Sequence, residues 1–256
     1  RRAGAEVRLV GAVGTDAFAD IALSLLAQDG VDLADIARVA VPTGAAFIAV
    51  DADGANQIVV AAGANAQASA AALALLPLGE GDILLLQREV PEAECLEAAR
   101  RMQQAGGRVI LNLAPAGAPD SALLECLDML VANEHEALVL AQSLGWGERE
   151  PDDIARRCDG ELGIACIVTL GAEGVVGWHG GVRRRLAAPA VNVVDTVAAG
   201  DSFTGAFAAA LAGGYGFSGA LQRGLAAGSL ACTAAGAQPS IPRKDAIEAL
   251  VGQSFL

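Results

Sequence analysis

Two carboxylates and a run of very small side chains stand together in residues 191–214. Asp195 comes first, and three residues with almost no side chain, at 198–200, lead directly to Asp201. A helix N-terminus carries free N–H groups and about half a positive charge, so it attracts anions. If a helix begins here, a proton-accepting carboxylate would lie beside amides able to hold a transferring phosphoryl group.

The flanking sequence predicts the elements that would position this junction. Residues 191–194 are mostly valine, which is typical of a strand. Phe203, Phe207 and Leu211 recur every four residues, which predicts a helix that begins at Asp201 and stops at the glycine pair 213–214. In a simpler interpretation, Asp201 only caps this helix and the small residues only form a tight turn.

The sequence DTVAAGDSFTGAF resembles the DTxGAGD signature of PfkB-type carbohydrate kinases, and its Ala-Ala-Gly-Asp portion is most similar to the ribokinases. The resemblance implies a kinase that uses ATP to phosphorylate a primary hydroxyl, O5 of D-ribose. It makes Asp201 the base and a sugar contact, in a reaction that depends on positioning and electrostatics. The amides that would hold the migrating charge belong to Ala198, Ala199, Gly200 and Asp201.

Three further segments extend the resemblance. Asn133 and Glu136 match an NxxE motif, which implies a nucleotide contact for Asn133 and a place near Mg²⁺ for Glu136. An asparagine helix cap with a capping-box glutamate fits this spacing equally well. Glu89 matches the sugar-binding glutamate of ribokinases, although an exposed acid before a proline is the alternative. The remaining nucleotide-binding residues that the resemblance implies are Thr169, Gly171, Gly174 and Gly200.

The sequence GAQPS at 236–240 resembles a turn that binds a monovalent cation in ribokinases. The resemblance implies a K⁺ ion that would stiffen the nearby anion-binding turn. Ribokinases often carry arginine where this chain has Ala234, a change that a backbone carbonyl ligand would tolerate. The implied K⁺ ligands are Asp195, Val197, Ala231, Ala234, Gly236 and Ser240.

The order of apolar segments predicts an α/β fold. Near-continuous apolar runs alternate with helical patterns from residue 70 onward, which predicts a parallel sheet covered on both faces. The resemblance implies a ribokinase-like doubly wound, mostly parallel sheet with a small β lid. We expect core α/β structure in residues 1–42, a lid hairpin in 43–62 that mediates a homodimer, and the remaining core in 63–256.

Composition limits the possible partners. The net charge of −13 argues against nucleic acid, because phosphate backbones require basic patches. No apolar run is long enough to span a membrane, and the five cysteines form no CxxC pair. Scattered cysteines favour reduced thiols and a cytoplasmic location. Composition thus leaves small molecules as the expected ligands, and the resemblance implies that these are a sugar, ATP, Mg²⁺ and K⁺.

The start of the chain leaves alternatives open. In ribokinases a first strand, part of the lid and a GGKGAN sugar-binding segment precede the sequence that matches residue 1, so the resemblance implies about forty further residues. Without them, a kinase of another sugar or nucleoside, such as fructose or adenosine, is an alternative. A truncated, non-catalytic protein that binds nucleotide or sugar is another. A Rossmann dehydrogenase has little support, because no GxGxxG follows a first strand.

Overall fold

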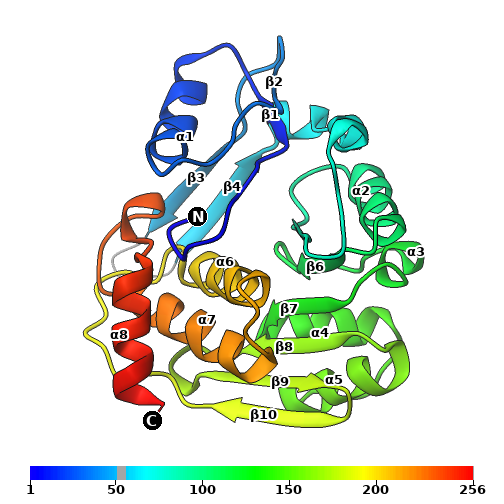
Figure 1. Ribbon diagram of the computed structural model, residues 1–256, viewed down its shortest axis with the longest axis vertical. Coiled ribbons are helices and arrows are strands. Elements are labelled where there is room, and N and C mark those ends of the chain that lie inside the picture. Colours follow the sequence, from blue (N-terminus) through cyan, green and yellow to red (C-terminus); the bar gives the residue numbers. More distant parts are fainter. Residues whose placement is uncertain (51–55, 256) are drawn as a thin grey trace.

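A six-stranded sheet organises the chain, of which the computed structural model describes residues 1–50 and 56–255 (Figure 1). Its strands lie in the order β10-β9-β8-β7-β6-β5. The strands β5 to β8 are parallel, whereas β9 and β10 form an antiparallel hairpin at one edge. Their bounds are β5 (Ile83–Leu86), β6 (Arg108–Asn112), β7 (Met129–Asn133), β8 (Ala165–Thr169), β9 (Val175–His179) and β10 (Val182–Leu186).

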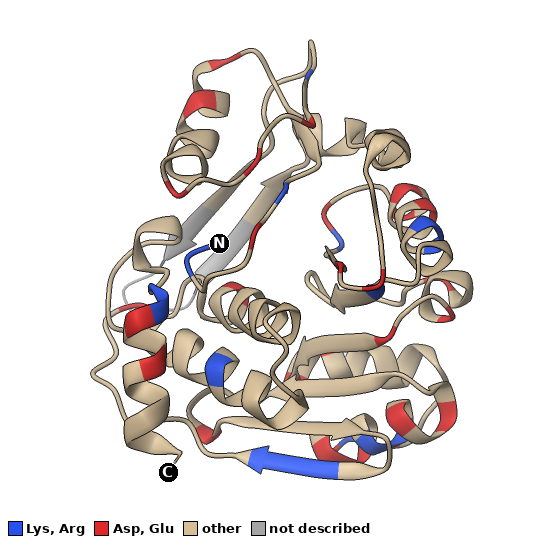
Figure 2. Cartoon of the chain, in the orientation of Figure 1, with Lys and Arg blue, Asp and Glu red and all other residues tan. Residues whose placement is uncertain are grey.

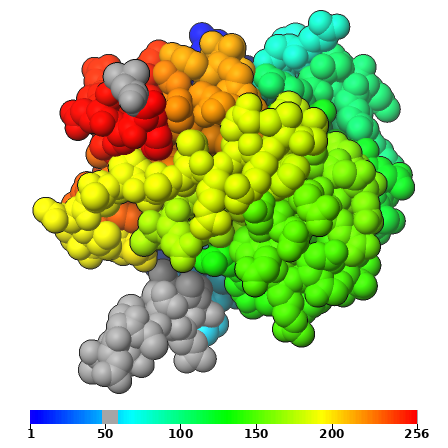
Figure 3. Space-filling view, turned by 90° about the horizontal axis from the view of Figure 1, so that it is seen from below, coloured from blue at the N-terminus to red at the C-terminus, as the bar shows by residue number. Residues whose placement is uncertain are grey.

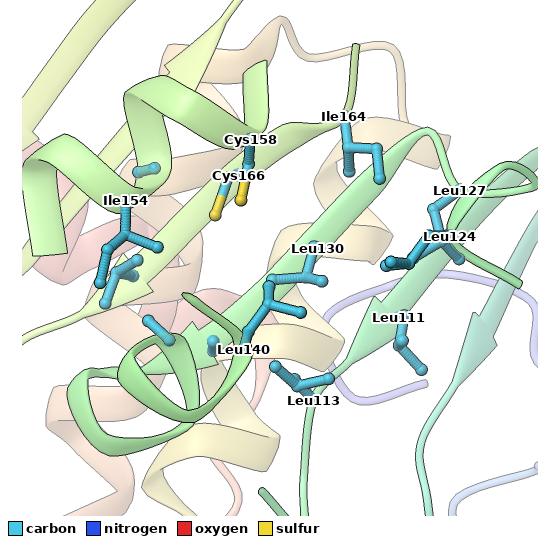
Figure 4. Close-up of a cluster of buried hydrophobic side chains, with 14 of the residues drawn as sticks. Leu111, Leu113, Leu124, Leu127, Leu130, Leu140, Ile154, Cys158, Ile164 and Cys166 are labelled. Carbon is cyan, nitrogen blue, oxygen red and sulfur yellow. The ribbon is translucent and has the colours of Figure 1, made fainter. Parts of the chain in front are cut away.

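Helices cover both faces of this sheet, as the sequence predicts. Alternate residues of a strand point to opposite faces, and in β6 Ile110 packs with Phe207 of α6, while Leu111 packs with Leu140 of α4. Figure 4 shows the cluster that contains Leu111 and Leu140, in which leucines, isoleucines and two cysteines fill the space under α4 and α5. The face that bears Leu111 carries α2 (Glu92–Gln104), α3 (Ser121–Leu124), α4 (Glu134–Ser143) and α5 (Pro151–Arg157). The face that bears Ile110 carries α6 (Ala199–Ala212) and α7 (Phe217–Ala231).

The elements β1, α1, β2, β3 and β4 form a group above the six-stranded sheet in Figure 1. The short strands β1 (Gly11–Val13) and β2 (Ile36–Arg38) pair in parallel around α1 (Ala17–Gln28). The strands β3 (Ala45–Val50) and β4 (Asn56–Ala61) then form the predicted antiparallel hairpin. Its Asp51–Gly54 turn lies outside the described residues.

The base of this hairpin is tied to α1 by one carboxylate. Asp16 caps α1 by accepting from the Ala19 N–H, and it also accepts the Thr43 N–H at 2.7 Å and the Thr43 hydroxyl at 2.8 Å. Gly63 follows β4 with a φ of 49°, and a side chain there would collide with the carbonyl of Pro42. These contacts hold the two ends of the hairpin, at Thr43 and Gly63, in place.

One predicted strand is wrong. Residues 191–194 do not form a strand, because the Val194 N–H bonds to the carbonyl of Cys232 after α7 rather than to a neighbouring strand. Figure 3 shows the segment after β10 (yellow) running across the surface next to α8 (Lys244–Ser254, red).

None of the helices in the described part of the chain combines the length and the apolar character needed to cross a membrane.

Candidate functional site

The N-terminus of α6 presents the groups that the sequence predicts. The helix begins at Ala199, two residues before the predicted start, so Asp201 is its third residue and is exposed to solvent. Among the described residues, the N–H groups of Gly200 and Asp201 have no hydrogen-bond acceptor. The Thr204 hydroxyl donates to the carbonyl of Gly200 at 2.9 Å and fixes this first turn. The helix therefore combines an ionisable carboxylate with open amide donors.

The residue that caps this helix has an unfavourable backbone conformation. Ala198 has a φ of 60° and a ψ of 11°, in the left-handed region that glycine adopts readily. For an L-residue with a side chain, this region costs about 1–2 kcal/mol. Its carbonyl nevertheless accepts the Ser202 N–H at 2.8 Å, and the helix starts from this bond. The turn that would receive an anion is thus held in a strained shape by its surroundings.

Close packing against α7 supplies part of that support. Gly224 and Gly228 of α7 face α6, and a Cβ added to Gly228 would lie 3.1 Å from the carbonyl oxygen of Ala199. A Cβ at Gly224 would lie 3.0 Å from the Phe203 carbonyl. The two glycines allow the helix backbones to approach closely, so that α7 buttresses the first turns of α6.

Asn133 and Glu136 lie at the junction of β7 and α4 and form a complete capping box. The Glu136 N–H donates to Oδ1 of Asn133, and the Asn133 N–H donates to Oε2 of Glu136, both at 2.8 Å. Glu136 is only 8% exposed, and its burial raises the pKa of this carboxyl. The Asn133 N–H and the charge of His135 lower the same pKa, and the charge of Asp201 raises it slightly.

Thr169 lies beside Asn133 at the carboxyl ends of two parallel strands. The two residues are register partners in the β7–β8 pair, and the Thr169 hydroxyl donates to the carbonyl of Ala132 at 3.4 Å. Gly171 and Gly174 follow with φ angles of 54° and 102°. A side chain at Gly174 would collide with the carbonyl oxygen of Leu186. These glycines are therefore required by the turn that leads β8 into β9.

Glu89 lies apart from these residues. It follows β5, which is separated from β7 by β6, and its side chain is exposed. Its N–H donates to the side-chain oxygen of Gln87. Arg88 bonds to the carbonyl of Pro115 at 2.9 Å and so joins the ends of β5 and β6. In the described residues no contact connects Glu89 with Asp201, and its role in sugar binding remains a prediction.

Two of the residues predicted to hold K⁺, Val197 and Gly236, contact Asp195 directly. One carboxylate oxygen accepts the Val197 N–H at 3.0 Å, and the other accepts the Gly236 N–H at 2.9 Å. These bonds, of which the one from Gly236 has the larger effect, hold the pKa of Asp195 below its usual value, so the carboxyl is ionised at neutral pH. Ala231 ends α7, and the Ala234 N–H donates to its carbonyl at 3.4 Å. The Ser240 hydroxyl is buried and donates to the carbonyl of Ala237.

The oxygen atoms of these residues are suitable ligands for a hard monovalent cation. They belong to a carboxylate, to backbone carbonyls and to a hydroxyl. Within the described residues, no group of three histidine, cysteine or acidic side chains converges in a way that could hold a metal ion. A cation at this site would therefore depend mainly on backbone carbonyls, which motif analysis can place only through the surrounding turn.

A cavity of about 160 Å³ opens beside Asp201, and the sequence analysis did not find most of its lining. Its wall includes the buried residue Ser202, whose hydroxyl has no partner among the described residues. Arg2 and Asp29 also line this cavity. No motif marks Arg2 in the sequence, and only the path of the chain brings it next to the C-terminal segment.

Figure 2 shows that the acidic residues (red) are spread over many elements, whereas β10 is strongly basic (blue).

Comparison with known proteins agrees with this geometry. The sequence model described as pfkB family carbohydrate kinase matches residues 1–244. A ribokinase of Haemophilus influenzae is 34% identical over 254 residues, which cover 97% of this chain and 83% of that protein. A ribokinase structure from Thermotoga maritima superimposes with a TM-score of 0.85 at 36% identity, covering 96% of this chain and 81% of the other. An Arabidopsis thaliana ribokinase solved with ribose and ATP gives a TM-score of 0.85 at 30% identity, with 98% and 83% covered.

The conformation of Ala198 leads to a prediction about stability. We expect Ala198→Gly to stabilise the protein by up to ~1 kcal/mol, because glycine adopts a positive φ without steric cost. Urea unfolding followed by circular dichroism measures this change. The control is Ala199→Gly at the first helical position, where glycine should lower the stability by ~0.5–1 kcal/mol. Equal destabilisation by both substitutions would contradict the strain at Ala198.

Proposed function

Because this chain belongs to the pfkB family of carbohydrate kinases, we propose that it is an ATP-dependent ribokinase, which transfers the γ-phosphoryl group of ATP to O5 of D-ribose. The observation that carries the proposal is the Asp201 carboxylate beside the open amides of Gly200 and Asp201 at the start of α6. The H. influenzae and A. thaliana relatives are both ribokinases, which favours ribose over fructose or adenosine as the acceptor.

In the proposed reaction, the Asp201 carboxylate takes the proton of the sugar hydroxyl. The hydroxyl oxygen forms a bond to the γ-phosphorus while the bond between that phosphorus and the β,γ-bridging oxygen breaks, and ADP leaves. The amides of Ala198, Gly200 and Asp201 would bind the oxygens of the migrating phosphoryl group, where negative charge is concentrated. They point in fixed directions before the substrate arrives, because the first turn of α6 is held by α7 and Thr204. The predicted contribution of the Ala199 amide is less favourable, because its N–H already donates to the carbonyl of Thr196 at 3.3 Å.

The remaining contacts are assigned by position. Asn133, Thr169, Gly171 and Gly174 lie at the carboxyl ends of β7 and β8, where nucleotides bind in open α/β sheets. Glu136 would face Mg²⁺, which neutralises charge on the nucleotide phosphates. Glu89 would contact the sugar from the end of β5.

Asp195 and the carbonyls around Gly236 would bind K⁺. Such an ion would hold the segment between Asp195 and Ala198 in place, as the Val197 and Gly236 N–H bonds of Asp195 already do. The ion would lie away from the reacting atoms, and its contribution would be the shape of the anion-binding turn.

Residues 43–62 are proposed as a lid over the sugar and as the contact between two copies of the chain. Phe47 is 64% exposed and lies directly opposite Val59, which is 59% exposed. A pair of large apolar side chains on an antiparallel hairpin is a suitable surface for a second hairpin.

The described cysteines are all free thiols, four of them buried, which favours the cytoplasm as the location.

Substrate choice tests the function directly. A coupled assay of ADP release should give a kcat/KM for D-ribose that exceeds those for D-fructose and adenosine by at least ~10-fold, because hydrogen-bonding sites discriminate strongly between polar substrates. The assay should be run with and without K⁺. A clear preference for fructose or adenosine would replace the ribokinase assignment with another kinase of the family.

Replacement of the proposed base tests the mechanism. Asp201→Asn keeps the size of the side chain but cannot accept the proton, so kcat/KM should fall at least ~100-fold, equivalent to about 3 kcal/mol. Asp245→Asn is the matched control, since Asp245 is also an acid in the first turn of a helix, α8. Ribose phosphorylation by Asp201→Asn at the normal rate would show that another group takes the proton.

The lid contact makes a prediction about assembly. Phe47→Asp should convert a dimer to a monomer in sedimentation velocity, because it would bury a charge in an apolar interface. Phe18→Asp on α1 is the control, since Phe18 is 59% exposed but lies outside the hairpin. A dimer that survives Phe47→Asp, or that Phe18→Asp disrupts equally, would place the contact elsewhere.

A further inference from the structure

Arg2 joins three segments of the chain that are far apart in the sequence. Its Nε donates to a carboxylate oxygen of Asp29 at 2.6 Å, at the end of α1. Its Nη1 donates to the carbonyls of Gln238 and Ile241, both at 2.8 Å. The Arg2 carbonyl in turn accepts the Lys244 N–H at the start of α8, at 2.9 Å. A single side chain thereby holds the segment between α7 and α8 against α1.

This contact is buried and electrically compensated. The side chain of Arg2 is 13% exposed and that of Asp29 is 12% exposed. A guanidinium offers five donors in a rigid plane, so it can satisfy one carboxylate and two carbonyls together. Removing it would leave Asp29 with the exposed Arg243 as its remaining side-chain ion pair. The carbonyls of Gln238 and Ile241 would lose their charged donor.

The two carbonyls that Arg2 binds flank Pro239 and Ser240. The turn formed by residues 236–241 is therefore held at both ends: Asp195 accepts the Gly236 N–H at 2.9 Å, and Arg2 fixes the peptide groups after Gln238 and Ile241. Between these anchors lie Ser240 and the carbonyl of Ala237, which accepts the Ser240 hydroxyl. The orientation of the oxygen ligands in the 236–241 turn thus depends on a residue more than two hundred positions away.

We propose that Arg2 is a positioning residue for monovalent-cation binding, which acts by orienting the 236–241 turn. The proposal rests on the proposed function, because it takes the 236–241 turn as the K⁺ site. Arg2 itself touches neither the ion nor the substrate. Its positive charge would oppose a nearby cation, and Asp29 neutralises that charge at 2.6 Å. The pair therefore fixes the turn without adding net charge beside the ion.

The test is Arg2→Lys, which keeps the charge but loses the planar fork. Two quantities are measured against K⁺ concentration: the midpoint of thermal unfolding, and ribose phosphorylation. Changes to groups that orient metal ligands typically weaken metal binding 10- to 100-fold. We therefore expect the K⁺ concentration for half of the maximal thermal shift to rise at least ~10-fold. Excess K⁺ should restore most of kcat.

Two control variants separate positioning from general stability. Arg223→Lys disrupts a different arginine–carboxylate pair, because Arg223 donates to both carboxylate oxygens of Glu248, at 2.8 and 2.7 Å. The side chain of Arg223 is 14% exposed, which is close to the value for Arg2. Arg243→Ala removes the second arginine on Asp29, one that is 74% exposed and does not contact the carbonyls. Both controls should keep the K⁺ midpoint within about twofold of the unmodified protein, even if Arg223→Lys lowers the unfolding temperature.

Each outcome decides a different point. A K⁺ midpoint unchanged in Arg2→Lys, with only a lower unfolding temperature, overturns the positioning role and leaves the cation site intact. An equal rise in Arg2→Lys and Arg223→Lys overturns it as well, since the effect would then follow from stability alone. If the unmodified protein shows no thermal response to K⁺, the cation site itself is wrong and the inference falls with it, whether or not ribose is phosphorylated.

Discussion

The structure depends on keeping the first turn of α6 open toward an anion. Free amides at a helix N-terminus are ordinarily covered by a capping side chain, and here Ala198 offers none. The turn adopts a left-handed conformation at Ala198 that an alanine resists, and the chain supports it from several sides. α7 approaches through Gly228, Thr204 bonds back to Gly200, and Asp195 holds the preceding loop. The uncapped helix end is therefore defined by its neighbours and by Thr204 of its own second turn, and not by a capping side chain.

The same constraint explains how an acidic chain can present a site for an anionic nucleotide. In the proposed function the attraction comes from backbone dipoles at one place, so a net charge of −13 would not prevent it. The surroundings of Asp195 and Glu136 shift the pKa values of these two carboxyls in opposite directions. Asp195 is held ionised by two N–H groups, whereas burial raises the pKa of Glu136. A cation bound near Glu136 would lower that pKa again.

Distant parts of the chain meet around this helix. Arg2 and Asp29 come from the beginning of the chain, yet they line the same cavity as Asp201 and contact the segment that follows α7. The hairpin β3–β4 is attached at the opposite end of α1 from Asp29, through Asp16 and Thr43. Polar contacts at the two ends of α1 thus anchor the β3–β4 hairpin, through Asp16, and the 236–241 turn, through Asp29 and Arg2.

Local pattern alone determined much of this architecture. The alternation of apolar runs with helical periodicity predicted β5 to β10 and the covering helices, and the capping box at Asn133 and Glu136 formed as its spacing indicated. Such features arise from interactions within a few residues, which a sequence displays directly. The valines at 191–194 misled, because a strand requires a partner and their partner is the carbonyl of Cys232. Tertiary structure alone decided that Ala198 takes a positive φ and that Arg2 reaches residues 238 and 241, since both depend on contacts between segments that no local pattern relates.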